Sequence, residues 1–238
     1  MEFFLMFFSG VGHVAAGMRM RGISTLEIDI KHGSHFDLTD ARIQRKVLKL
    51  ARRHRICGAC IGMPCTSFSL ARNRTRVIRT CEFPWGLGGR ELWSKNDVKS
   101  LELGNELASF TIKLIKILHR RGILWISENP FTSNAWHLPE ILQLMTSPRV
   151  QYQRVDMCGY GTRWKKPTGL LCGNCNSTIL QQQLSRVCNG KRGLCGHTCR
   201  RRVILSGSAP AGGMPWTKVA QAYPRRFADA VCCAITSC

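Results

Sequence analysis

The chain has 238 residues, of which 44% are hydrophobic, so it is long enough to bury one substantial core and carry a small appended module. Its 35 lysine and arginine residues against 14 acidic residues give a net charge of +21, which favours a polyanionic partner, most simply a nucleic acid. A merely soluble basic protein is the alternative. No apolar run approaches the ~20 residues that a membrane span needs, so we expect no membrane association.

The cysteine content bears on the compartment. Thirteen cysteines would suit a secreted disulfide scaffold, but the chain is too long and too apolar to need one, and an odd number cannot pair completely. We therefore expect a reducing, intracellular environment. The apolar start imitates a signal peptide, but its first charged residue is acidic and the run ends in a glycine loop, which favours a buried first strand.

Apolar runs predict the first elements. Residues 3–8 are a continuous apolar run, the pattern of a strand that is covered on both faces. A glycine loop and a short helix follow, and residues 23–28 indicate a second strand. Asp40 is placed to cap a basic helix, and residues 56–63 form a third apolar strand that ends just before Cys65.

The clearest helix is predicted between residues 94 and 122. Ser94 and Asp97 match a capping box, and apolar residues then recur every three or four positions. Gly122 ends this helix, and residues 123–127 form another buried strand. Strands that alternate with helices predict an α/β fold with a doubly wound, mostly parallel sheet, in which ligands bind beyond the carboxyl ends of the strands.

Three segments are expected along the chain. Residues 1–170 form a catalytic core, residues 171–202 form a Cys-rich basic insert, and residues 203–238 complete the core with a strand and a helix interrupted near Pro224. The insert offers more ligands than a tetrahedral zinc site needs, namely Cys172, Cys175, Cys188, Cys195, His197 and Cys199. Cysteines packed in a core without a metal are the alternative.

Glycines and acids fall at the edge where the predicted parallel strands end. Gly10 and Gly12 let the backbone approach a bound cofactor closely, and an acid that ends the next strand can hold ribose hydroxyls. An ordinary tight turn is the alternative, because the third glycine of the dinucleotide fingerprint is absent. Asp37 adds a second acid, which could accept a hydrogen bond from an exocyclic amine.

Cys65 follows Pro64 at the end of a predicted strand. A thiol has an ordinary pKa of about 8.5, so a nucleophilic cysteine needs help from its surroundings. The loop that follows is rich in arginines and backbone donors, and we expect it to give that help. A structural cysteine is the alternative.

Four motifs occur in the order FFSGVGHVAAGMRMRG, LEID, GMPCTSFS and ISENP. In order and approximate spacing, residues 3–170 resemble the cytosine-5 DNA methyltransferases, and the tail segment PWTKVAQAYPRRFADA is similar to a late helix of that family. The resemblance implies a class I fold that binds S-adenosylmethionine. The residues it implies are Phe8, Ser9, Gly10 and Gly12 for the cofactor loop, Glu27 with Asp29 for the ribose, Asp37 for the adenine, Pro64, Cys65 and Ser67 for the nucleophile loop, and Glu128 and Asn129 for the base.

The chain also departs from the family pattern. Pro130 stands where the family usually has valine, and the segment GYGTRWKKPT replaces the later Gln-x-Arg-x-Arg motif, so Arg163, Lys165 or Lys166 is expected in its role. The usual long target-recognition domain does not fit in this length. The alternative function is therefore a catalytically inactive, zinc-stabilised nucleic-acid-binding protein on the same fold.

The resemblance implies a covalent mechanism, in which the Cys65 thiolate attacks C6 of cytosine, Glu128 holds the N3 and N4 edge, and C5 is methylated. The base must be flipped out or single-stranded, and DNA is expected as the partner rather than RNA. Contacts to nucleic acid are expected from Ser67, Arg72, Arg74, Arg76, Arg79, Arg163, Lys165, Lys166, Arg200, Arg201 and Arg202. The compact size would suit a virus or mobile element, which would place the protein in the nucleus or cytoplasm of a host cell.

Overall fold

The computed structural model describes residues 2–70, 76–206 and 213–237. Within these residues six strands form one sheet in the order β2-β1-β3-β4-β6-β5. The strands are β1 Phe3–Phe7, β2 Ser24–Ile28, β3 Ile56–Gly62, β4 Trp125–Pro130, β5 Val150–Asp156 and β6 Pro167–Gly173. Strands β1 to β4 pair in parallel, and β6 is antiparallel to both β4 and β5. The predicted α/β fold with a mostly parallel sheet is confirmed.

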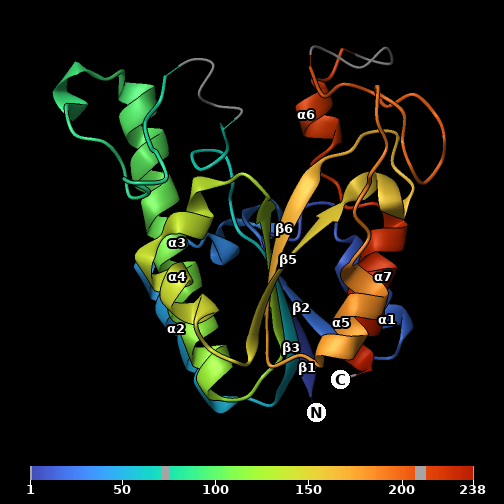
Figure 1. Cartoon of the computed structure of the whole chain (residues 1–238). Helices are drawn as coiled ribbons and strands as arrows, with labels where there is room; N and C mark the ends of the chain where they lie inside the picture. The colour runs from blue at the N-terminus through green and yellow to red at the C-terminus, as the bar shows by residue number, and fades with distance from the viewer. Residues whose placement is uncertain (1, 71–75, 207–212, 238) are drawn as a thin grey trace.

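Helices cover both faces of this sheet. They are α1 His13–Met20, α2 Ala41–Arg53, α3 Lys95–Arg120, α4 Pro139–Met145, α5 Ser177–Leu184, α6 Trp216–Val219 and α7 Arg225–Thr236. Helices α2, α3 and α4 lie on one face, and α1, α5 and α7 lie on the other (Figure 1). Because both faces are covered, the side chains of β1 are buried on both sides, as its uninterrupted apolar run predicted.

Hydrogen bonds confirm two predicted helix starts. The Asp40 carboxylate accepts from a backbone N–H in the first turn of α2, and Ser94 Oγ accepts from the backbone N–H of Asp97 at 3.1 Å at the start of α3. Pro224 lies between α6 and α7 and is the N-cap of α7. Proline is well tolerated at a helix start, because the missing N–H would have no partner within the helix there.

The Cys-rich segment begins inside the sheet. The predicted boundary after residue 170 falls within β6, and α5 packs against α7 on the face of the sheet. Residues 185–206 follow an irregular path beyond α5. The strand expected in residues 203–238 is not found among the described residues of that range. In the same described part of the chain, no helix is long and apolar enough to cross a bilayer.

The carboxyl ends of β1 to β4 meet at one edge of the sheet. Phe7 pairs with Ile28 of β2 and with Ile61 of β3, and Gly62 of β3 pairs with Glu128 of β4. The glycine loop after β1, the acidic turn after β2, the cysteine loop after β3 and the end of β4 therefore lie side by side. This edge is where the sequence predicted the ligand site.

Candidate active site

A cavity opens at this edge of the sheet. It encloses about 220 Å³, or about 820 Å³ when the part open to solvent is included. The predicted site residues that line it are Phe8, Ser9, Gly10, Gly12, Asp29, Pro64, Cys65, Glu128 and Lys166. His13, Met63 and Tyr223 also line it.

The glycine loop presents backbone to this cavity. Gly10 and Gly12 have φ angles of +53° and +79°, in the left-handed region that favours glycine. The Asp29 carboxylate accepts from the backbone N–H of Gly10 at 3.1 Å and so joins the turn after β2 to the loop after β1. A side chain at Gly10 would meet no described atom within 4 Å. The loop therefore leaves open space where a ligand can approach the chain.

The two acids at the end of β2 have different surroundings. Glu27 Oε1 accepts from Arg19 Nη2 at 2.6 Å, Oε2 lies 3.6 Å from His32 Nε2, and the residue does not line the cavity. Burial alone would raise the pKa of Glu27, but Arg19, followed by Ser9 and His32, lowers it overall. Asp29, in contrast, lines the cavity. Of the two acids, Asp29 is the one placed to contact a ligand there.

Asp37 lies away from the cavity. It is absent from the cavity lining, and its Oδ1 accepts from both the backbone N–H and the hydroxyl of Thr39, at 2.9 and 2.8 Å. These bonds form a local turn before α2. The structure therefore does not bring Asp37 to the other site residues, although the sequence placed it on the adenine side.

Cys65 lies in the cavity wall directly after β3. Burial raises the pKa of its thiol, the Glu128 carboxylate raises it further, and the Lys166 ammonium lowers it in part. We expected the surroundings of Cys65 to favour its thiolate. For the described residues this expectation is wrong, because their net effect raises the pKa of Cys65. The loop arginines Arg72 and Arg74, from which help was expected, lie outside the described residues.

Glu128 is buried and is held by two other side chains. Tyr223 Oη donates to Glu128 Oε2 at 2.9 Å, and Lys166 Nζ lies 3.8 Å from Oε1. Burial and the Glu128 charge raise the pKa of Tyr223 well above its ordinary value, so it remains a neutral donor. Asn129 points elsewhere, because its Nδ2 donates to the carbonyl of Met63 at 2.8 Å. Asn129 thus fixes the start of the cysteine loop to β4.

Sequence reasoning missed Tyr223 as a site residue. Its available signal was its place directly before Pro224, in the tail segment that is similar to a late helix of the methyltransferases. Tyr223 lies in the turn between α6 and α7, and the fold brings its hydroxyl to Glu128.

Two residues that were expected to contact nucleic acid are buried instead. Arg79 is 1% exposed, and its Nη2 donates to Ser67 Oγ and to the carbonyl of Leu101, both at 3.0 Å. Its guanidinium lies 3.9 Å above the centre of the Phe68 ring. A side chain at Gly104 of α3 would clash with Ser67 Oγ, so the glycine makes room for this contact. Arg79 therefore ties the cysteine loop, through Ser67, to Leu101 of α3.

The remaining basic candidates differ in exposure. The exposed ones are Arg76, Arg163, Arg200 and Arg201. Lys165 and Arg202 are half-buried: Lys165 Nζ lies 3.6 Å from Asp156 Oδ2, and Arg202 Nη2 donates to the carbonyl of Gly190 at 2.8 Å. The exposed arginines are therefore the better candidates for contacts with phosphates.

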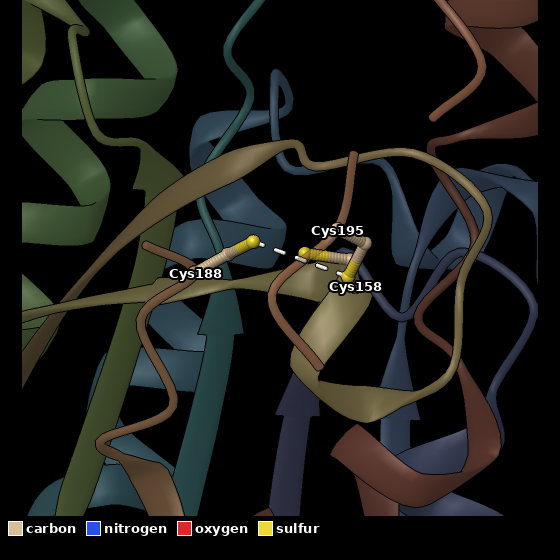
Figure 2. A group of neighbouring side chains, drawn as sticks. All are labelled: Cys158, Cys188 and Cys195. Atoms are coloured by element: carbon tan, nitrogen blue, oxygen red, sulfur yellow. Dashed lines mark hydrogen bonds between the residues drawn. The ribbon is translucent and has the colours of Figure 1, made fainter. Parts of the chain in front are cut away.

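Three buried thiols meet near the end of β5. Cys158 lies in the 3-10 turn Met157–Tyr160, and Cys188 and Cys195 come from the irregular segment after α5. Their Sγ atoms all lie within 4.8 Å of one another, and those of Cys188 and Cys195 are 3.9 Å apart. Figure 2 shows the three side chains pointing toward one another. Such a group can bind a metal ion.

This thiol group differs from the predicted ligand set. It contains Cys188 and Cys195 but also Cys158, which sequence reasoning missed because it belongs to no Cys-x-x-Cys pair. Cys172 is buried in β6 and Cys175 follows it, and both pack in the apolar cluster beneath α7 rather than with the other thiols. Side chains alternate across a strand, so the residue type alone did not reveal which face Cys172 occupies.

The thiols of this group have opposite pKa shifts. Burial raises the pKa of Cys158, and the neighbouring thiols add to this effect. Burial alone would also raise the pKa of Cys195, but the Thr198 hydroxyl and the backbone N–H groups of His197 and Thr198 lower it to about 7. His197 and Cys199, the other predicted ligands, are exposed residues of the same turn.

No known family model matches this chain, and no curated protein matches it closely enough to count as a relative. The interpretation of the cavity therefore depends on its own geometry. That geometry combines a glycine loop, a carboxylate, a thiol and a buried glutamate at the carboxyl edge of a doubly wound sheet.

Proposed function

We propose that the protein is an S-adenosylmethionine-dependent methyltransferase that acts on cytosine C5 in nucleic acid, with DNA preferred to RNA. The observation that carries this proposal is that Cys65 and Glu128 line one cavity together with the glycine loop and Asp29. These four features come from the ends of four different strands. Their resemblance in sequence order to the cytosine-5 methyltransferases is thus matched by proximity in space.

The residues beside the glycine loop fit the proposed cofactor. The open backbone at Gly10 accommodates a ligand at close range, and the Asp29 carboxylate can accept hydrogen bonds from ribose hydroxyls. S-adenosylmethionine, when bound, supplies an electrophilic methyl group. The sheet also supports the proposal, because the four parallel strands end at the edge where doubly wound folds bind their ligands.

Cys65 is the proposed nucleophile. Cytosine C5 reacts poorly until a group adds to C6, so the Cys65 thiolate forms a bond to C6 and directs electron density to C5. After C5 has taken the methyl group, its proton is lost to solvent, the C6–S bond breaks, and the thiolate leaves. The raised pKa of Cys65 means that the thiolate is the minor form in the empty cavity.

Glu128 is the proposed base-binding residue. Tyr223 occupies Oε2, whereas the buried Oε1 has no hydrogen-bond partner among the described residues and lies 3.8 Å from Lys166 Nζ. A buried polar atom of this kind has a strong tendency to acquire a partner. The exocyclic amine of cytosine would provide one, and this contact would hold the base in the cavity beside Cys65.

A covalent trap tests this mechanism. DNA of random sequence that contains 5-fluorocytosine is incubated with the protein and S-adenosylmethionine, and adducts are mapped by mass spectrometry. The wild type should accumulate a DNA adduct at Cys65, because fluorine cannot leave C5 as a proton. Cys65→Ser should form none, and Cys81→Ser, at an exposed cysteine, is the matched control that should react like the wild type. Methylation by Cys65→Ser at the wild-type rate would refute the role of the thiol.

A second candidate function is a catalytically inactive, zinc-stabilised nucleic-acid-binding protein. The raised pKa of Cys65 favours it, because it disfavours the nucleophile, and the buried thiols of Cys158, Cys188 and Cys195 are consistent with a structural zinc ion in either case. Calorimetry with S-adenosylmethionine separates the two functions. Binding of the cofactor supports the enzyme, and DNA binding without cofactor binding supports the inactive protein.

A further inference from the structure

We propose that Cys158, Cys188 and Cys195 bind a structural zinc ion with His197 as the fourth ligand, and that this ion fixes the segment that carries Lys166 beside the candidate active site. This choice of ligands rests on the structural zinc ion that is consistent with both candidate functions. It does not depend on whether the protein transfers methyl groups. It replaces Cys172 and Cys175, the ligands that their Cys-x-x-Cys spacing suggested.

The sulfur geometry matches a tetrahedral zinc site. With Zn–S bonds of about 2.3 Å, two sulfurs on a tetrahedral ion lie about 3.8 Å apart. The Sγ atoms of Cys188 and Cys195 are 3.9 Å apart, and Cys158 Sγ lies within 4.8 Å of both. A disulfide needs about 2.05 Å, so this pair is placed for a shared ion rather than for a covalent bond.

A backbone hydrogen bond also points at one of the sulfurs. The N–H of Gly196 donates to Cys188 Sγ at 3.3 Å. Hydrogen bonds to a charged form stabilise that form, and a metal binds the thiolate rather than the thiol. The three thiols also form a buried cluster apart from the two large apolar clusters. The distances between the sulfurs and the hydrogen bond to Cys188 fit metal ligands.

His197 is the candidate for the fourth position, although it lies outside the group of donor atoms that are within 4.8 Å of one another. A side-chain carbon placed on Gly159 would lie 3.2 Å from His197 Nε2, so the imidazole lies over the residue next to Cys158. Cys199 belongs to the same turn, in which its backbone N–H donates to the carbonyl of Cys195 at 2.8 Å. Because His197 approaches the Cys158 side of the cluster, we assign the fourth ligand to it and use Cys199 as the comparison.

The ligands come from two segments that are joined at a buried carboxylate. Cys158 follows β5, whereas Cys188 and Cys195 follow α5. Asp156 Oδ2 accepts from the backbone N–H of Cys188 at 2.8 Å and lies 3.6 Å from Lys165 Nζ. Loss of the ion would remove one cross-link between these two segments and leave the hydrogen bonds of Asp156, Arg186 and Tyr160 to hold them.

Lys166 depends on this junction for its position. The backbone N–H of Met157 donates to the carbonyl of Lys165 at 2.7 Å, directly before Lys166, which has a φ of +33° and reaches Glu128. A left-handed φ is unfavourable for a lysine, so the surrounding contacts must maintain it. The ion therefore stabilises a strained residue of the cavity wall from outside the cavity.

Metal content tests the assignment. The full chain is purified without chelator, and zinc is measured by elemental analysis; about one zinc per chain is expected. Cys158→Ser should fall to near zero, whereas Cys175→Ser, the matched control, should keep its zinc. The opposite pattern, or a wild type without zinc after growth in zinc-supplemented medium, would overturn the proposal. Cobalt exchanged into the wild type should show thiolate-to-cobalt absorption.

Two further measurements cover the fourth ligand and folding. His197→Ala should weaken zinc binding at least tenfold and Cys199→Ser should not; the reverse result would overturn the assignment of His197.

If Cys158→Ser fails to fold, hydrogen exchange of the wild type, measured with and without chelator, takes the place of that variant. Exchange should rise in residues 156–166 and 186–203 while β1 to β4 stay protected, and equal exchange with and without chelator would refute the structural role. Cofactor binding by calorimetry, measured on the same samples, reports separately on the proposed methyltransferase.

Discussion

Tyr223 donates a hydrogen bond to Glu128 across 2.9 Å, although the two residues are 95 positions apart in the sequence. Glu128 lies in β4 near its carboxyl end, and Tyr223 lies in the turn between α6 and α7. The contact therefore joins the C-terminal helices to the cavity wall. It also assigns one carboxylate oxygen of Glu128 to the protein and leaves the other for a ligand.

Tyr223→Phe should lower both stability and methyl transfer. The change leaves a buried carboxylate oxygen without its donor, which costs about 1–3 kcal/mol. Urea denaturation gives the stability, and methylation of random-sequence DNA gives the activity. Tyr160→Phe is the matched control, because Tyr160 Oη donates to the carbonyl of Gln183 at 3.2 Å outside the cavity. Tyr160→Phe should lower stability without lowering specific activity. An equal loss of specific activity in both variants would contradict the role of Tyr223.

The alkylation of Cys65 should depend on pH in a direction that the charges determine. Burial and Glu128 raise its pKa, so half-maximal alkylation is expected above the pH of about 8.5 that is typical of a thiol. Lys166→Met removes the charge that lowers this pKa, and the curve should move to still higher pH. Peptide mass spectrometry after timed iodoacetamide treatment follows Cys65, with the exposed Cys81 as the internal control. A shift to lower pH in Lys166→Met would contradict the prediction.

Asp29 and Glu27 should differ in cofactor binding. Asp29 lines the cavity, so Asp29→Asn should weaken binding of S-adenosylmethionine by roughly tenfold to a hundredfold, the value of a charged hydrogen bond of about 1.5–3 kcal/mol. Glu27→Gln breaks an ion pair with Arg19 and should change affinity much less. Calorimetry measures both variants. A larger loss of affinity in Glu27→Gln would return the ribose role to Glu27.

Gly104→Ala should destabilise the protein although alanine is the better helix former. The added methyl group would clash with Ser67 Oγ and crowd Arg79, and overpacking of this kind costs about 1–3 kcal/mol. Alanine regains only about 1 kcal/mol in a helix. Gly88→Ala is the control, since a side chain there meets no described atom within 4 Å. Equal urea midpoints for the two variants would show that the Ser67–Arg79 contact is loosely packed.

Arg200 and Arg201 should contribute to DNA binding through phosphates. Both are exposed, so replacing both by alanine should reduce the slope of log affinity against log salt by up to about 1.8, or about 0.9 for each lost contact. Fluorescence anisotropy with B-form DNA measures this slope. Arg52 and Arg53, which end α2 near the amino ends of the strands, supply the matched double variant. An identical slope in both variants would place the DNA elsewhere.

Local signals were sufficient for much of the fold. The apolar run of β1 predicted a strand covered on both faces, and Ser94 with Asp97 predicted the start of α3, because these patterns depend on residues close in sequence. The ends of β1, β3 and β4 placed Gly10, Cys65 and Glu128 at one edge by the geometry of parallel strands alone. Much of the candidate site was therefore accessible to sequence reasoning.

Contacts between distant segments were not accessible in this way. Arg79 looked like a surface arginine, because nothing near it in the sequence shows that Gly104 opens a space for it in α3. Cys158 has no cysteine close to it in the sequence, so nothing local marked it as a ligand. Cys172 belongs to β6, and only the pairing of β6 with β4 and β5 in the folded chain shows that it lies in the sheet. The upward shift of the Cys65 pKa also needed the burial and the Glu128 charge that only the folded chain supplies.

The cavity wall has a consequence for protein synthesis. Phe8 and Tyr223 both line it, so the ribosome releases one wall residue long before the other. Until residue 223 has been made, Glu128 lacks its tyrosine partner. Ligand binding is thus acquired late in translation, and a product that stops short of residue 223 would lack both Tyr223 and helix α7, whose apolar residues cover one face of the sheet.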